Sequence, residues 1–174
     1  ADPNNMEMAN FLGICYCELG DFQKGMAIFN QIAVQDNPKY AEDVVKAKEN
    51  IKLYTNNRIA KLQGENDFDG IIAFADEMLA VNPQDALAQK IRLQALFDKK
   101  DYAGVIASAE EAAAVQIDEE ERSDVYFSLG AAYNARTMTP QAIDALSKVT
   151  AGTNVAAAQK TVAQLKENAA KANS

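Results

Sequence analysis

The sequence has no histidine and only two cysteines among its 174 residues. Without histidine, the chain lacks the commonest general base and metal ligand, and it cannot form a Ser-His or Cys-His nucleophile pair. Cys15 and Cys17 are two positions apart, so on a helix their side chains would point about 200° away from each other. We therefore expect no local disulfide, no metal site, no cofactor, no catalytic residue and no enzyme activity within this chain.

Other missing features narrow the function further. The eight glycines are isolated, so neither a GxGxxG nor a GxxxxGK[ST] phosphate loop is present. No apolar run approaches the roughly 20 residues that a membrane span needs. The formal net charge of −8 argues against a nucleic-acid partner, because binding phosphates requires a basic stripe. An acidic field would attract a basic partner, although moderate acidity also serves solubility alone.

A short turn recurs between stretches of helical periodicity. Its three copies are Gly20-Asp21-Phe22, Asn66-Asp67-Phe68 and Lys100-Asp101-Tyr102. The last two aspartates are 34 residues apart, which is the length of a helix–turn–helix repeat. Small and apolar residues follow each copy at helical spacing. The pattern predicts a stack of helical hairpins.

A second signature precedes the first turn and returns later in the chain. It reads Phe11-Leu12-Gly13-Ile14-Cys15-Tyr16 in one place and Phe127-Ser128-Leu129-Gly130-Ala131-Ala132-Tyr133 in the other. Together with the turns, these residues resemble the tetratricopeptide repeat (TPR) family, whose repeats are helical hairpins. The resemblance implies an all-α fold, an α-solenoid of about four TPR-like hairpins with a C-terminal capping helix.

The resemblance covers most of the chain, which we expect to be one array over residues 1–174. It assigns repeats to residues 6–39, 52–85, 86–119 and 123–151. The second repeat departs from the family pattern, with Ile59 where glycine is usual and Leu62 where tyrosine is usual. The fourth replaces the recurring turn with Thr137-Met138-Thr139-Pro140.

Helix starts are predicted from prolines and acidic residues. Each proline follows a residue that can cap a helix, in Asp2-Pro3, Asn37-Pro38, Asn82-Pro83 and Thr139-Pro140. A proline at the first helical position loses nothing, because its missing N–H would have had no partner there. The run Asp118-Glu119-Glu120-Glu121 predicts a capping box, with Asp118 as the cap and Glu121 reaching back to it.

The stretch from Pro38 to Gln63 is irregular in the repeat pattern. Its apolar and aromatic residues keep three- and four-residue spacing, without a further proline or a glycine. One long connecting helix over about 38–63 fits this spacing. A break at Thr55-Asn56-Asn57 is the alternative, because these residues form helices weakly.

The two ends of the chain differ. Val155, Ala158, Val162, Leu165 and Ala169 form a narrow apolar stripe, which predicts a capping helix over about 154–170. The opening Ala1-Asp2-Pro3-Asn4-Asn5 is similar to the end of a TPR, which favours a truncated or processed chain, although Asp2 could simply cap a helix. Two unpaired thiols are compatible with either cytoplasm or periplasm, so the compartment stays open.

Interior glycines indicate close packing of helix pairs. Gly13 and Gly130 fall inside helices, where each costs about 1 kcal/mol relative to alanine. As in the family, close approach of the paired helix offsets that cost. Gly25, Ala109 and Ala142 supply the small residues opposite.

The resemblance also implies a binding surface, the concave groove lined by the first helix of each repeat. Mapped onto this sequence, the groove residues are Asn10, Ile14, Cys17, Asn56, Ala60, Gln63, Lys90, Gln94, Phe97, Phe127, Ala131 and Asn134. The amides can both donate to and accept from a peptide backbone, and the two phenylalanines offer an apolar anchor. The alternative is that the amides are ordinary polar surface and the phenylalanines fill gaps between repeats.

These features favour a non-catalytic protein–protein interaction module that holds a peptide or helix of a partner. One subset of the family clamps a terminal carboxylate with Lys, Arg and Asn, but only Lys90 and the nearby amides survive here, so we do not expect that role. Two alternatives remain: a structural end-segment that self-associates or caps a longer array, and an accessory domain of an enzyme encoded upstream.

Overall fold

The computed structural model describes residues 5–173, and all of its regular structure is helical, with no strand in that range. The all-α class predicted from the sequence is therefore confirmed. No helix in the described part of the chain combines the length and apolar character needed to cross a membrane. The chain divides into two compact units, the first ending at Glu65 and the second beginning at Asn66. This boundary lies inside the range 52–85 that the resemblance assigned to one repeat.

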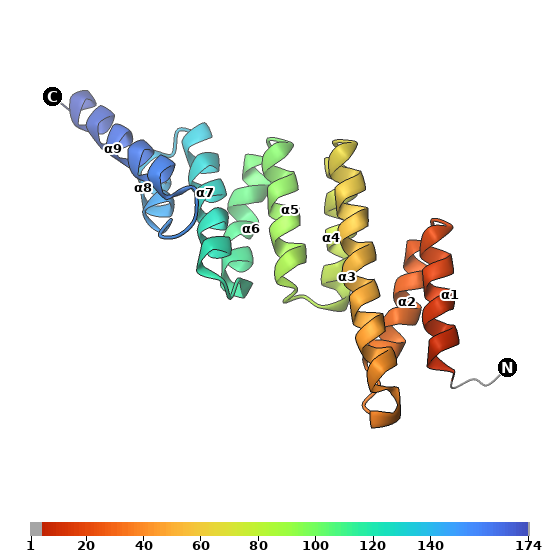
Figure 1. The fold of residues 1–174 in the computed structure, drawn as a ribbon. Coiled ribbons are helices and arrows are strands. Elements are labelled where there is room, and N and C mark those ends of the chain that lie inside the picture. The colour runs from red at the N-terminus through yellow and green to blue at the C-terminus, as the bar shows by residue number, and fades with distance from the viewer. Residues whose placement is uncertain (1–4, 174) are drawn as a thin grey trace. The chain divides into compact units, whose positions relative to one another are not determined.

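The described residues of the first unit form three α-helices and one turn of 3₁₀-helix. They are α1 (Met6–Glu18), α2 (Phe22–Ala33), η1 (Pro38–Tyr40) and α3 (Ala41–Gly64). Helix α1 packs on α2, and both pack on α3 (Figure 1). Phe29, Ile32 and Ala47 are almost completely buried at the centre of this unit.

Helix α3 is continuous over its 24 residues, and no break occurs at Thr55-Asn56-Asn57. Thr55 is only 6% exposed. Packing of this side chain offsets the weak helix propensity of the three residues, because tertiary contacts routinely outweigh propensity differences of a few tenths of a kcal/mol.

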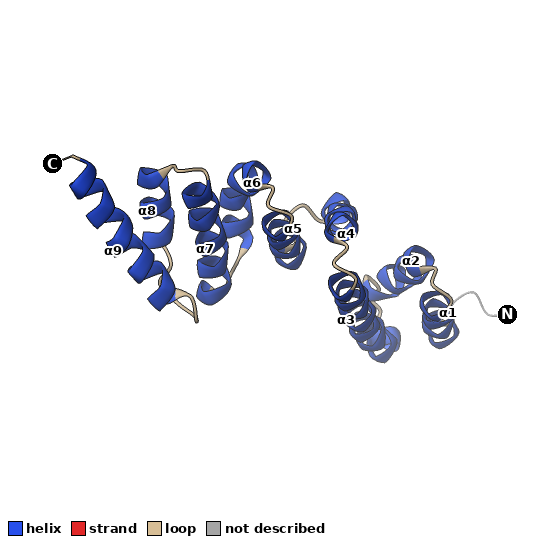
Figure 2. Ribbon diagram, turned by 90° about the horizontal axis from the view of Figure 1, so that it is seen from above, coloured by secondary structure: helices blue, strands red, loops and turns tan. Residues whose placement is uncertain are grey.

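Residues 66–173 of the second unit form six helices. They are α4 (Phe68–Val81), α5 (Ala86–Asp98), α6 (Tyr102–Val115), α7 (Glu119–Ala135), α8 (Thr139–Ser147) and α9 (Val155–Ala172). Each helix packs on the next along the chain, and α5 also contacts α7 (Figures 1 and 2). The core between α5, α6 and α7 is built from small and branched side chains, among them Leu93, Val105, Ala109, Ala112, Val125 and Leu129.

The recurring turns all have the same construction. Asp21, Asp67 and Asp101 are the N-caps of α2, α4 and α6, and each side chain accepts a hydrogen bond from the backbone N–H three residues later. The residue before each aspartate has a positive φ: 87° for Gly20, 52° for Asn66 and 64° for Lys100. A residue in this left-handed conformation ends the preceding helix and reverses the chain direction before the next helix begins.

The fourth turn keeps this backbone without the aspartate. Thr137 has a φ of 57°, and Met138 occupies the N-cap position of α8 with no side-chain hydrogen bond. The prediction that Thr139 caps this helix is wrong, because Thr139 is already its first residue. Pro140 lies in the first turn of α8, where its missing N–H costs no hydrogen bond.

Of the other predicted helix starts, the one at Asn37 is confirmed and the one at Asn82 is wrong. Asn37 caps η1, and its side chain accepts a hydrogen bond from the N–H of Lys39, as expected. Asn82 does not cap a helix, because α5 begins only at Ala86 and its N-cap is Asp85. The side chain of Asn82 instead accepts from the N–H of Gln84 and forms a turn around Pro83. The predicted Asp2-Pro3 start lies outside the described residues.

The capping box predicted at the start of α7 is confirmed for Asp118 but not for Glu121. Asp118 caps the helix and accepts hydrogen bonds from the N–H groups of Glu120 and Glu121. Glu121 does not reach back as predicted, because its carboxylate pairs with the ammonium of Lys90 on α5. A full charge on a neighbouring helix competes well with a single N–H at the helix start.

Tyr54 joins α3 to α1 and gives the first unit a pH-dependent contact. Its hydroxyl donates a 2.7 Å hydrogen bond to Glu18, and burial followed by this bond raises the pKa of Tyr54 to about 12. An unfolded tyrosine has a pKa of about 10. The folded state therefore holds this proton more tightly, and the resulting stabilisation is complete below pH 10 and lost as the pH rises toward 12.

We expect a titration of tyrosinate absorbance to reveal a phenol with a midpoint of about 12, apart from Tyr126, whose pKa is also raised by burial and by the charge of Glu110. The Tyr54→Phe variant should lose this late component. If all six tyrosines ionised together near the ordinary value, the Tyr54–Glu18 contact would be absent in solution.

Candidate functional site

A groove between α5 and α7 brings together four of the residues predicted from the sequence. Its volume is about 230 Å³. It is lined by Lys90, Leu93, Gln94 and Phe97 of α5, by Asp124, Val125, Phe127 and Ser128 of α7, and by Asn154. The two helices contact each other directly, so one wall of the groove comes from each. Lys90, Gln94, Phe97 and Phe127 were expected on this surface.

The floor of the groove is apolar. Leu93 and Val125 are 3% and 1% exposed and belong to the core beneath it. Phe97 is half-buried and rests edge-on against Tyr102, with ring centroids 5.9 Å apart. Phe127 is also half-buried, and it packs beside the cluster of Leu146, Val149 and Ala158. Each phenylalanine is thus fixed on one side by the protein while it also borders the groove.

The α5 wall carries polar groups that are already paired. The ammonium of Lys90 forms an ion pair with Glu121 of α7. The side-chain N–H of Gln94 donates a 2.8 Å hydrogen bond to Asp98, one turn further along α5. These contacts hold both long side chains in place along the rim.

The opposite wall contains a half-buried carboxylate. Asp124 of α7 accepts a 2.9 Å hydrogen bond from the side-chain amide of Asn154, the residue before α9. Ser123, which is 1% exposed, fixes this loop, because its hydroxyl accepts hydrogen bonds of 3.1 Å from the N–H groups of Thr150 and Ala151. The groove therefore includes a residue that the sequence places 27 positions after Phe127.

Ser128 is the most enclosed polar side chain of the groove. It is 8% exposed and lines the groove. Its position on the groove wall leaves it able to donate to or accept from a bound molecule.

The remaining predicted residues do not line this groove. Asn134 is exposed in the last turn of α7. Ile14 and Asn56 belong to the first unit, where Ile14 packs beside the core and Asn56 is exposed on α3. Asn10 is 5% exposed, and its amide donates a 3.0 Å hydrogen bond to the carbonyl of Asp43, which ties α1 to α3.

Three polar lining residues were not predicted from the sequence. Asp124 stands three residues before Phe127 and four before Ser128, so the face of α7 was a usable signal for Asp124. Asn154 gave no such signal, because only the loop held by Ser123 brings it to the groove.

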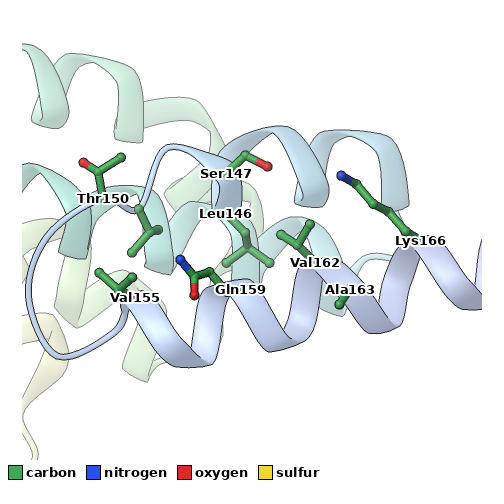
Figure 3. Close-up of a pocket in the computed structure, with 9 residues that line it drawn as sticks. Leu146, Ser147, Thr150, Val155, Gln159, Val162, Ala163 and Lys166 are labelled. Carbon is green, nitrogen blue, oxygen red and sulfur yellow. The ribbon is translucent and has the colours of Figure 1, made fainter.

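A larger groove lies between α8 and α9 (Figure 3). It measures about 550 Å³, and Figure 3 shows Val155, Gln159 and Val162 of α9 extending toward Leu146 of α8. The polar groups at its edge, Gln159 and Lys166, are exposed. Its lining offers fewer enclosed polar groups than the α5–α7 groove.

The two thiols are both free and partly buried. Burial, followed by the charges of Glu18 and Asp21, raises the pKa of Cys17 and keeps it protonated. A protonated thiol is a poor nucleophile and metal ligand. Between residues 5 and 173, no group of three acidic or cysteine side chains is arranged to hold a metal ion.

Comparisons with protein-family models, curated proteins and solved structures give no match for this chain.

Proposed function

We propose that this chain is a non-catalytic protein-interaction module whose α5–α7 groove holds a peptide or helix of a partner. The observation that carries the proposal is the pair of half-buried phenylalanines, Phe97 and Phe127, bordering one groove from two different helices. Anchored aromatic side chains within a polar rim are typical of the energetic centre of an interface.

We further propose that the fold is an α-solenoid of TPR-like hairpins. Three observations support it. The recurring turns share a residue of positive φ followed by a capping aspartate, each helix packs on the next within its unit, and α5 contacts α7 directly although α6 separates them in the sequence. In such a stack, the first helices of neighbouring hairpins line one surface. Helices α5 and α7 would be those helices.

A peptide selection tests the proposed groove. We expect a displayed random-peptide library panned on the protein to yield sequences that lose at least about tenfold in affinity for the Phe97→Ala/Phe127→Ala variant, since truncating an interface anchor typically costs more than 1 kcal/mol. The Val81→Ala variant serves as control, because Val81 is 81% exposed on α4 and does not line the groove. Selected peptides that bind all three proteins equally, or a selection that enriches none, would refute the groove.

Self-association is a second candidate, supported by an apolar face of α1. Met8, Phe11 and Leu12 are 62%, 61% and 49% exposed. When Leu12-Gly13 is aligned with Leu129-Gly130, Met8 and Leu12 correspond to Val125 and Leu129 of α7, which are 1% and 2% exposed in the core shared with α6. A second copy could cover the face of α1 as α6 covers that of α7. Light scattering that finds a monomer at all concentrations would exclude this candidate.

A further inference from the structure

The α5–α7 groove contains more negative than positive charge once Glu121, the ion-pair partner of Lys90, is counted. Its lining contains one cation, Lys90, and one anion, Asp124. The ammonium of Lys90 already pairs with Glu121. Within residues 5–173, the side-chain partner of Asp124 is the neutral amide of Asn154, and that of Asp98 is the amide of Gln94. No cation within the described residues forms an ion pair with either of these two aspartates.

This imbalance places negative potential beside an apolar floor. Asp124 is half-buried, so its charge is less screened by water and salt than that of a surface carboxylate. It stands three residues before Phe127 on the same helix, which puts carboxylate and ring on one face of α7. The whole chain is also acidic, with a formal charge of −8, and the long-range field adds to the local one.

We propose that the groove recognises a partner segment in which a large apolar side chain stands next to an arginine or lysine. This assignment rests on the proposed function and names its ligand class. The apolar side chain would lie between Phe97 and Phe127, and the cation would pair with Asp124, which forms no ion pair with any residue that the structure describes. Arginine suits the position better than lysine, because its flat guanidinium can bind the carboxylate and stack on a phenylalanine ring at once.

The hydroxyl of Ser128 is a further polar group that a ligand in the groove could contact. Ser128 is 8% exposed and lines the groove. A peptide backbone crossing the groove offers both a donor and an acceptor for this hydroxyl. The groove thus combines an apolar anchor site, the carboxylate of Asp124 and the hydroxyl of Ser128 within about 230 Å³.

Defined peptides test the assignment on the full chain. The probes are three fluorescent peptides of equal length, each with a central phenylalanine flanked by arginine, by glutamine or by glutamate. We expect fluorescence anisotropy to give an affinity for the arginine peptide at least about tenfold higher than for the glutamine peptide, and no measurable binding of the glutamate peptide. The preference should shrink as salt is added, because salt screens charge pairs.

The Asp124→Asn variant should reduce the preference for the arginine peptide severalfold and leave the affinity for the glutamine peptide unchanged. An asparagine can still accept the hydrogen bond from Asn154, so the wall is retained. The matched control is Glu111→Gln, which removes one negative charge from an exposed position on α6 and should retain the full preference. Circular dichroism of both variants verifies the helical fold.

The outcomes distinguish failure of the proposed cation preference from failure of the proposed peptide-binding groove. If all three peptides bound equally and the Phe97→Ala/Phe127→Ala variant lost them, the groove would stand and the cation preference would be wrong. If Asp124→Asn and Glu111→Gln reduced the preference equally, the effect would belong to the net charge and not to the groove. If no peptide bound, or if binding persisted without the two phenylalanines, the proposed function would fail together with the assignment.

Discussion

Replacing Phe29 with alanine is expected to lower the free energy of unfolding of the first unit by about 3–5 kcal/mol. Phe29 is 0% exposed and stands at the centre of that unit. Its ring stacks on Tyr54 of α3 with centroids 6.1 Å apart, and it also covers Gly13 of α1. One side chain therefore contacts both neighbouring helices, so its loss leaves a cavity that neither helix can fill alone.

Urea denaturation followed by circular dichroism measures this loss. The control is Phe11→Ala, the same substitution at a position that is 61% exposed on α1, and it should change stability by no more than about 0.5 kcal/mol. Equal effects of the two substitutions would contradict the packing of α2 between α1 and α3. A second readout is local, because the pKa of Tyr54 should fall back toward its ordinary value when the ring that helps to bury it is removed.

The helices were predictable because their start signals are local. Asp21, Asp67 and Asp101 each bind an N–H three residues away, so the sequence alone contains both partners of the cap. Asn82 misled the prediction for the opposite reason. Two residues, Asn82 and Asp85, can each cap a chain segment near Pro83, and only the folded position of α5 decides between them.

The sequence could predict which candidate site residues share a face of one helix, but not which helices come together. Lys90, Gln94 and Phe97 recur at spacings of four and three residues, which places them on one face of α5. Asn10 shares such a face on α1, but the close packing of α1 on α3 buries it. That packing depends on the path of the long helix α3, and a resemblance to regular repeats carries no information about this path.

The charge of the groove required the structure for a similar reason. The sequence shows several acidic residues in the first turns of α7, and the structure gives three of them different partners. Asp118 caps the helix, Glu121 neutralises Lys90, and Asp124 receives an amide. Only these pairings identify Asp124 as a lining carboxylate that has no cation partner among the described residues.

The second large effect is expected from Gly130→Leu, which should destabilise the second unit by about 1–3 kcal/mol or more. A Cβ added to Gly130 would lie 2.4 Å from Cγ of Leu146 and 3.2 Å from its backbone nitrogen. The first contact could relax by a change of rotamer, but the second involves the backbone of α8. A leucine must therefore push α8 away from α7 and loosen the core around Leu146.

Gly64→Leu is the control. It makes the same change of residue type at a position where a side chain meets no neighbour, so it isolates the steric effect at Gly130. Gly64 ends α3, has no atom within 4 Å of an added Cβ, and is exposed. Gly64→Leu should therefore be neutral or slightly stabilising, because leucine has the higher helix propensity. Thermal unfolding followed by circular dichroism compares the two variants. An unchanged midpoint for Gly130→Leu would mean that α7 and α8 do not approach each other at Gly130, and the register that also aligns Gly130 with Gly13 would then be incorrect.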